Sequence, residues 1–175
     1  MIGYGSPELA AAFRTVRGNT VQIAKEIPED QYDFVAAPGV RPVRELLAHI
    51  AFISRLQEDF HRVKRVTTLS GYDFVGYMTS ATAEEKKPRS KAEIVTLLET
   101  RGEEFARWLE SLTPDFLAET YTDPRGENPR TRFENLLSAK EHEMHHRGQL
   151  MFTERMLGIV PHLTRQMQER MAAHR

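Results

Sequence analysis

The chain has 175 residues, of which 24 are lysine or arginine and 25 are aspartate or glutamate, and 40% of it is hydrophobic. This composition predicts one globular domain, and the near-zero net charge argues against a general nucleic-acid-coating role. The chain has no cysteine, which excludes disulfides, cysteine zinc sites and a cysteine nucleophile.

No apolar run is long enough to span a membrane, since the longest, residues 9–13, has five residues. The first residues, MIGYGSPELAAAF, lack the basic start and long apolar stretch of a signal peptide. We therefore expect a cytoplasmic protein with a small-molecule substrate and with no membrane or nucleic-acid partner.

Four long segments repeat their apolar residues at helical spacing, which predicts four amphipathic helices. In the first, Ser6 is the expected N-cap, Pro7 takes the first helical position, and Pro28 marks the stop. The second runs from about residue 42 to about residue 66. The third and fourth each begin with a capping box, at residues 90–93 and 131–134, and the fourth ends near Gly158.

The segments between these helices read as connections. Residues 67–89 form a long connection that could let the second and third helices run parallel. Its large side chains either cover a site as a lid or anchor the loop: Tyr72, Phe74, Tyr77 and Met78. A short helix is expected at Thr113-Pro114, a turn-rich linker over residues 121–130, and no sheet anywhere.

These elements predict an all-α four-helix bundle. We expect a single domain over residues 1–175, with a core of about 6–158 and a C-terminal extension of 159–175 that could be helical. On the fourth helix, Leu137, Met144 and Met151 recur every seven residues. This seam is expected either to meet its copy in a homodimer or to be covered by the tail, residues 161–175.

Three histidines are candidates for binding a metal ion. His142 and His146 are four residues apart, which on a helix places them about 40° apart around the axis and about 6 Å apart at Cβ. His49 lies inside the apolar stripe of the second helix, so its imidazole should point into the core. A single histidine in a core is more often a hydrogen-bonded residue than a metal ligand. Inward-facing histidines on two different helices instead favour a metal site, and three histidine ligands would leave one coordination position open.

Other residues compete with this assignment. His145 is about 60° from His142 around the helix, so geometry alone leaves it as a candidate ligand, whereas His61, His162 and His174 are expected on the surface. Residues 142–146 also match H-E-x-x-H, in which Glu143 would be the general base of a zinc protease. We reject that interpretation because the extended signature needs glycine and histidine where this chain has Gln149 and Phe152.

Three tracts together resemble the DinB/YfiT-like family of metal-dependent enzymes: HEMHHRGQL, VRPVRELLAHIA and IPEDQYDFVAAPG. The resemblance covers residues 13–158 and implies a four-helix bundle of up-down-down-up order. It also implies a divalent zinc or nickel ion on His49, His142 and His146, and it selects against His145. Family members often form homodimers, and their known activities are transfer of low-molecular-weight thiols, hydrolysis or isomerisation.

We therefore expect a metal-dependent enzyme, either a transferase that uses an external low-molecular-weight thiol or a hydrolase. Gln149 is the candidate catalytic residue, as a hydrogen-bond partner of a metal-bound ligand, or else it makes an inter-helix hydrogen bond. Glu143 is expected to orient a neighbour or face solvent, and Gly102 to leave room for substrate or for close helix approach. The alternative is a non-catalytic, stress-responsive protein that binds a small molecule and whose metal is structural or vestigial.

Overall fold

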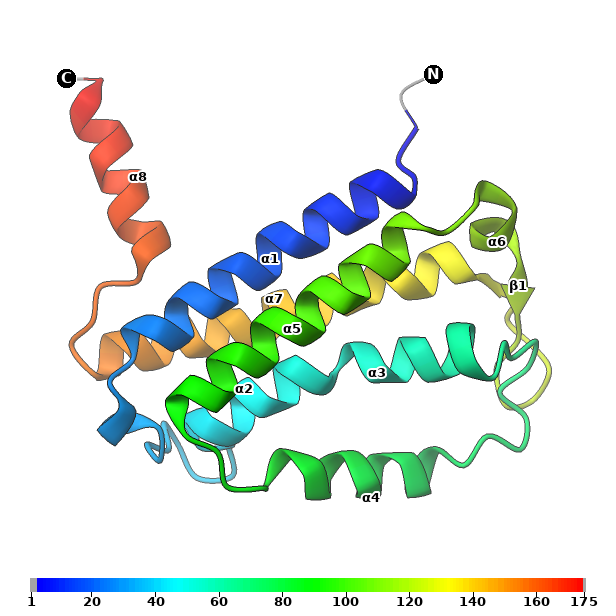
Figure 1. The fold of residues 1–175 in the computed structure, drawn as a ribbon, viewed down its shortest axis with the longest axis horizontal. Helices are drawn as coiled ribbons and strands as arrows, with labels where there is room; N and C mark the ends of the chain where they lie inside the picture. The colour runs from blue at the N-terminus through cyan, green and yellow to red at the C-terminus, as the bar shows by residue number, and fades with distance from the viewer. Residues whose placement is uncertain (1–2, 175) are drawn as a thin grey trace.

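The structure is a computed structural model that describes residues 3–174. Four helical rods form a bundle (Figure 1). They are α1 (Ser6–Glu26), α2 (Val43–Phe52) with its continuation, α5 (Lys91–Glu110) and α7 (Arg132–Met156). The continuation of α2 consists of α3 (Ser54–Gln57) and the π-helical turn η2 (Glu58–Val63).

The rods follow the up-down-down-up order that the family resemblance implied. In Figure 1, α1 and α7 run in one direction, whereas α2–α3 and α5 run in the other. The rods α2–α3 and α5 can run parallel because the long connection between them returns the chain to the end of the bundle where α2 begins. This connection contains a helix of its own, α4 (Phe74–Glu85), which packs on the outside of α2.

Capping residues explain where the helices begin and end. The side chains of Ser90 and Thr131 accept the amides three residues later, in complete capping boxes that start α5 and α7. Thr113 caps α6 (Pro114–Ala118) in the same way, and Gly158 has the positive φ of +77° expected after the end of α7. The N-cap of α1 is Gly5 rather than Ser6, whose hydroxyl donates instead to the carbonyl of Leu112.

Two predicted segments, the second helix and the turn-rich linker, differ from the structure. The second helix is not continuous to residue 66, because it breaks at Ile53 and ends at Val63. The predicted linker contains a short antiparallel pair, β1 (Thr120–Tyr121) and β2 (Arg130–Thr131), so the expectation of no strand was wrong. Between α1 and α2 lie a short 3₁₀ turn, η1 (Glu29–Gln31), and a loop that reaches residue 42.

The core consists of two apolar clusters at opposite ends of the bundle. One contains Val21, Ile23, Leu47, Leu98 and Leu150 among its members, and the other contains Leu9, Phe13, Phe105, Leu109 and Leu136. Along α1, α5 and α7, the residues between these clusters are Arg17, Gly102 and Glu143. A polar layer therefore separates the two halves of the core.

Arg17 fills this layer and contacts all four rods. Its guanidinium pairs with Glu143, and it also donates to the carbonyl oxygens of Leu98 and Ile50. A Cβ at Gly102 would lie 2.6 Å from Cγ of Arg17, so the missing side chain makes room for arginine rather than for substrate. Glu143 is fully buried, which corrects the expectation that it faces solvent and removes it as a zinc-protease base.

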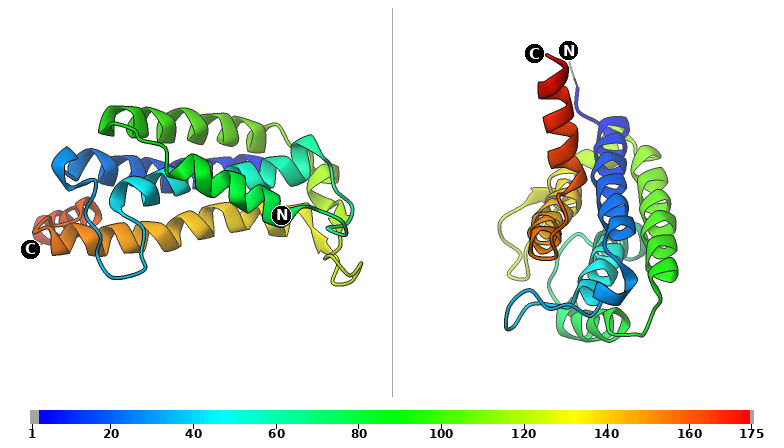
Figure 2. Two further views of the ribbon diagram at one scale, coloured as in Figure 1. Left: turned by 90° about the horizontal axis from the view of Figure 1, so that it is seen from below. Right: turned by 90° about the vertical axis from the view of Figure 1, so that its left-hand side faces the viewer.

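The C-terminal extension forms α8 (His162–Ala173), which leaves the bundle where α1 and α7 end (Figure 2). It projects away from the bundle rather than packing along α7, the helix that carries the predicted seam of Leu137, Met144 and Met151. Leu137 and Met151 instead pack against the two core clusters, whereas Met144 is 44% exposed. The helices within residues 3–174 are too short or too polar to cross a lipid bilayer.

Candidate metal centre

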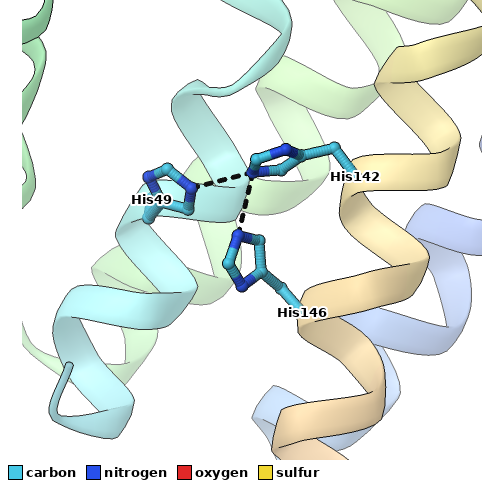
Figure 3. A group of neighbouring side chains, drawn as sticks. All are labelled: His49, His142 and His146. Carbon is cyan, nitrogen blue, oxygen red and sulfur yellow. Dashed lines mark hydrogen bonds between the residues drawn. The ribbon is translucent and has the colours of Figure 1, made fainter. Parts of the chain in front are cut away.

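The imidazoles of His49, His142 and His146 converge between α2 and α7 (Figure 3). The Nε2 atoms of His49 and His142 are 3.0 Å apart, and those of His142 and His146 are 2.8 Å apart. One ring nitrogen from each of the three residues lies within 4.8 Å of the others. Residues 93 positions apart in sequence, His49 and His142, thus share one cluster because the bundle places the two helices side by side.

Hydrogen bonds to Nδ1 fix two of these rings. Nδ1 of His49 lies 2.6 Å from Oε1 of Glu85, and Nδ1 of His146 lies 2.8 Å from Oε1 of Gln149. An ionised carboxylate and an amide oxygen only accept hydrogen bonds, so each Nδ1 must carry the proton. The lone pairs of the two Nε2 atoms consequently point toward the cluster, as metal ligands require.

Glu85 reaches this site from α4 and is itself held by Arg41, whose Nε lies 3.1 Å from Oε2. Burial acts to raise the pKa of Glu85, but the hydrogen bond from His49 and the charge of Arg41 outweigh it, and the net pKa is lowered. The carboxylate is therefore ionised at neutral pH. A carboxylate behind a histidine increases the basicity of the ring and fixes its orientation.

Two histidines of the cluster, His142 and His146, are poor bases. Burial, together with the neighbouring imidazoles and Arg41, lowers the pKa of His142 to about 4. Burial also lowers the pKa of His146, against the opposing hydrogen bond from Gln149. Both rings are thus neutral at neutral pH, which is the form that coordinates a metal ion.

The donor set fits a divalent transition metal ion. Three neutral imidazole nitrogens suit zinc or nickel, and at zinc–nitrogen bonds of about 2.0–2.1 Å tetrahedral ligand atoms are roughly 3.3 Å apart. The observed separations of 2.8 and 3.0 Å are close to that spacing. Three protein ligands would leave one coordination position for an exogenous ligand.

A cavity of about 640 Å³ lies beside the cluster and includes His146 in its wall. Its other polar wall residues include Arg41, His145, Gln149 and Thr153. Of the three histidines of the cluster, His146 borders this cavity, so a small molecule in the cavity can contact His146. The helix α4 contributes nothing to its wall, and Tyr72, which donates to Asp59, anchors the long connection instead of forming a lid here.

The other four histidines are not all exposed, although the sequence predicts exposure for three of them. His145 is exposed and lies outside the cluster, and His174 is also exposed. The prediction was wrong for His61, which is fully buried because Arg132 and Asn135 of α7 hold its two nitrogens. It was also wrong for His162, which is 5% exposed because it packs at the junction of α1 and α8.

The sequence analysis did not identify Glu85, and it did not predict the hydrogen bond that Gln149 makes on its own helix. Glu85 belongs to a run of charged residues, 84–87, that reads as a solvated helix end, so no local signal marks it. The amide oxygen of Gln149 accepts from His146 on the same helix, which is not the inter-helix hydrogen bond that we considered, and its contact with a metal-bound ligand stays a prediction. It supports a candidate ligand and also lines the cavity.

Comparisons with known proteins agree with this fold. The model of the DinB superfamily matches residues 12–150. A DinB-like protein from Bacillus subtilis, YjoA, has a similar structure, with a TM-score of 0.64, 22% identity and coverage of 86% of this chain and 92% of that chain. YfiT from Bacillus subtilis has a TM-score of 0.69, 17% identity and coverage of 88% of each chain.

YfiT is described as a probable metal-dependent hydrolase with an unusual four-helix bundle topology. At these identities, the two structural likenesses show a shared fold, and no curated protein matches the chain. The family match covers most of the sequence, including all three histidines of the cluster. The chain belongs to the DinB superfamily, as the three tracts predicted.

Proposed function

We propose that this DinB superfamily protein is a metal-dependent enzyme whose zinc or nickel ion is held by His49, His142 and His146. The observation that carries the proposal is the convergence of three imidazoles, two of which have their Nε2 lone pairs directed inward by Glu85 and Gln149. A histidine that only packs in a core needs no such arrangement. Bound there, the ion would act as a Lewis acid and lower the pKa of a coordinated water or thiol.

The protein's own residues would prepare this chemistry in defined ways. Glu85 orients His49, and Gln149 orients His146, so both are positioning residues. Arg41 compensates the buried charge of Glu85. The adjoining cavity admits a small molecule to the face of His146.

Two reaction classes suit an open coordination position. A transferase would use an external low-molecular-weight thiol as the nucleophile, because the chain has no cysteine of its own. A hydrolase would use water, and the structurally similar YfiT is described as a probable metal-dependent hydrolase. In both classes the protein supplies the same ion-binding site and the same substrate cavity.

The rival function is a non-catalytic, stress-responsive protein that binds a small molecule and whose metal is structural or vestigial. A structural zinc ion normally has four protein ligands, and the cluster within residues 3–174 offers three. The accessible cavity beside His146 also favours a reactive site over a closed one.

The test is metal analysis by mass spectrometry of protein purified without chelators. We expect about one zinc or nickel ion per chain in the parent protein and in His145→Ala, the control on the same helix. His49→Ala and His142→Ala should each lose most of the metal while keeping the helical circular dichroism spectrum. Equal metal content in all four proteins would overturn the ligand assignment.

A second measurement addresses turnover. The metal-loaded protein is assayed against electrophiles with and without low-molecular-weight thiols, and against ester and amide substrates. Thiol-dependent product supports the transferase, and thiol-independent product supports the hydrolase. A metal-loaded protein that binds small molecules without any turnover supports the non-catalytic alternative instead.

A further inference from the structure

Arg41 stands at the wall of the cavity with part of its hydrogen-bonding capacity unused. Its Nε donates to Glu85, but no partner is found for its Nη1 and Nη2 atoms among residues 3–174. The side chain is 37% exposed, so these donors remain accessible from the cavity. Because Glu85 also contacts Nδ1 of His49, the ion pair between Glu85 and Arg41 places Arg41 near the candidate metal site.

The rest of the cavity wall is largely apolar. Ala36, Ala37 and Val40 of the loop before α2 face Leu46 of α2 and Phe152 of α7. Phe152 is 62% exposed and Val40 is 44% exposed, so the cavity presents apolar surface that a ligand could cover. One cationic group beside an apolar surface is the arrangement expected for an amphipathic small molecule.

We propose that this cavity binds an organic monocarboxylate with an apolar body, whose carboxylate pairs with Arg41 and whose body lies against Val40, Leu46 and Phe152. A guanidinium offers two parallel N–H donors that match the two oxygens of a carboxylate. Arg41 has its Nη1 and Nη2 atoms available for this contact because Glu85 occupies only Nε.

The charges at the cavity favour one negative charge on the ligand. No lysine and no second arginine is part of the wall that the structure describes, and Glu85 already compensates part of the charge of Arg41. A dianionic phosphate would therefore be matched less well than a carboxylate. Small polar thiols would leave the apolar wall uncovered, so the inferred ligand is the substrate rather than a thiol cosubstrate.

The inference deepens the proposed function, because a carboxylate on Arg41 would hold the adjoining bonds of the ligand near His146. Binding itself does not require the ion. It can therefore be measured on both the zinc-loaded protein and the protein dialysed against a chelator, which separates the contribution of Arg41 from that of the metal.

The experiment compares three probes by isothermal titration calorimetry: phenylbutyrate, its neutral amide, and succinate, which has carboxylates without an apolar body. We expect phenylbutyrate to bind at least about tenfold more tightly than either other probe, in the presence and absence of zinc, since charge-assisted hydrogen bonds are worth that much or more. Arg41→Gln should bind phenylbutyrate no more tightly than its neutral amide. The side-chain amide of the introduced glutamine can still donate a hydrogen bond to Glu85.

Matched controls complete the design. Phe152→Ala should weaken the binding of phenylbutyrate and of its amide alike. Phe74→Ala, at a phenylalanine of α4 that is 51% exposed, should change the binding of neither. Arg107→Gln, on the exposed face of α5, should leave the carboxylate preference intact. These variants lie at exposed positions, so loss of folding does not explain their effects.

Two outcomes would overturn the inference that Arg41 binds a carboxylate but would leave the proposed metal-dependent function unaffected. If the carboxylate preference survives in Arg41→Gln and disappears when zinc is removed, the carboxylate binds the ion and not Arg41. If phenylbutyrate fails to bind to any of the proteins, the cavity does not take this class of ligand. Neither result bears on the metal analysis, which tests the three histidine ligands independently.

Discussion

Arg17 and Glu143 form a buried ion pair at the centre of the bundle, with Nε 2.9 Å from Oε1 and side chains that are 4% and 0% exposed. Glu143 directly follows His142 on α7, and Arg17 also binds the carbonyl oxygen of Ile50, which directly follows His49. The pair therefore links the backbones that carry the two halves of the histidine cluster. Its hydrogen bonds fix how α2 and α7 are rotated toward each other.

Removing one member of this pair should strongly destabilise the protein. Arg17→Met leaves the carboxylate of Glu143 buried without its partner, which typically costs about 3–5 kcal/mol. Urea denaturation measures the change in the free energy of unfolding. The control is Arg107→Met, in an exposed pair with Glu103, where a cost below about 1 kcal/mol is expected. Equal effects for the two variants would contradict a structural role for the buried pair.

Gly102 should be intolerant of a side chain because of the same arginine. The Cβ of Gly102→Ala would approach Arg17 to 2.6 Å, and such overpacking costs about 1–3 kcal/mol. The cost should shrink when the substitution is made in Arg17→Ala. Gly18→Ala on α1 is the control, since nothing lies within 4 Å of its Cβ and alanine there should stabilise the helix by about 0.5–1 kcal/mol. A loss that is independent of Arg17 would refute this explanation.

Glu85 should tune the affinity of the histidine site for metal. Glu85→Gln keeps an oxygen that can accept from His49 but loses the negative charge, so metal affinity should fall by about 10–100-fold. Competition with a chromophoric chelator measures this affinity. Glu84→Gln is the neighbouring control, because Glu84 pairs with Lys87 and Arg89. Unchanged affinity in Glu85→Gln would show that α4 does not support the site.

Stability should depend on pH through Glu154, a fully buried residue of α7 whose two carboxylate oxygens lack partners among the described residues. Burial, and then the charge of Glu26, raise the pKa of Glu154 from 4.5 to about 7. The folded state thus binds the proton more tightly than the unfolded state does. The stabilising contribution is complete below pH 4.5 and is lost as the pH rises through 7.

Glu154→Gln should remove this dependence, since the amide cannot ionise. At pH 8 the variant is expected to be more stable than the parent by an amount on the order of 3 kcal/mol, and the gap should close toward pH 5. Thermal unfolding across this range measures the difference. Glu104→Gln, at an exposed site on α5, is the control and should follow the parent at every pH. A constant gap between Glu154→Gln and the parent would contradict the assignment.

Met144 is expected to contact a second copy of the chain. Leu137 and Met151 pack against the core clusters, so Met144, which is 44% exposed, is the residue of the predicted seam that a second copy would cover in the homodimer that we propose. Met144→Glu should lower the molar mass in solution, measured by light scattering, from dimer to monomer. Met167→Glu on α8, at an exposed methionine away from the seam, is the control. A monomeric parent protein would refute the homodimer.

The sequence by itself determined the elements of the bundle, because their signals are local. Capping boxes at Ser90 and Thr131 and the glycine at 158 set helix ends, and each depends on residues within one turn. The spacing of His142 and His146 placed both on one face of α7, since helix geometry fixes that relation. The apolar stripe around His49 likewise predicted that it is buried, and it is 6% exposed.

Only the tertiary structure decided which polar groups meet. Glu85, Arg17 and the buried His61 gave no local signal, because a charged residue in a helical segment reads as solvated unless its partner is known. Those partners lie 36, 126 and 71 positions away, at His49, Glu143 and Arg132. Burying a charge is costly unless a distant group compensates it, so these contacts depend on how the helices pack and not on the sequence around each residue.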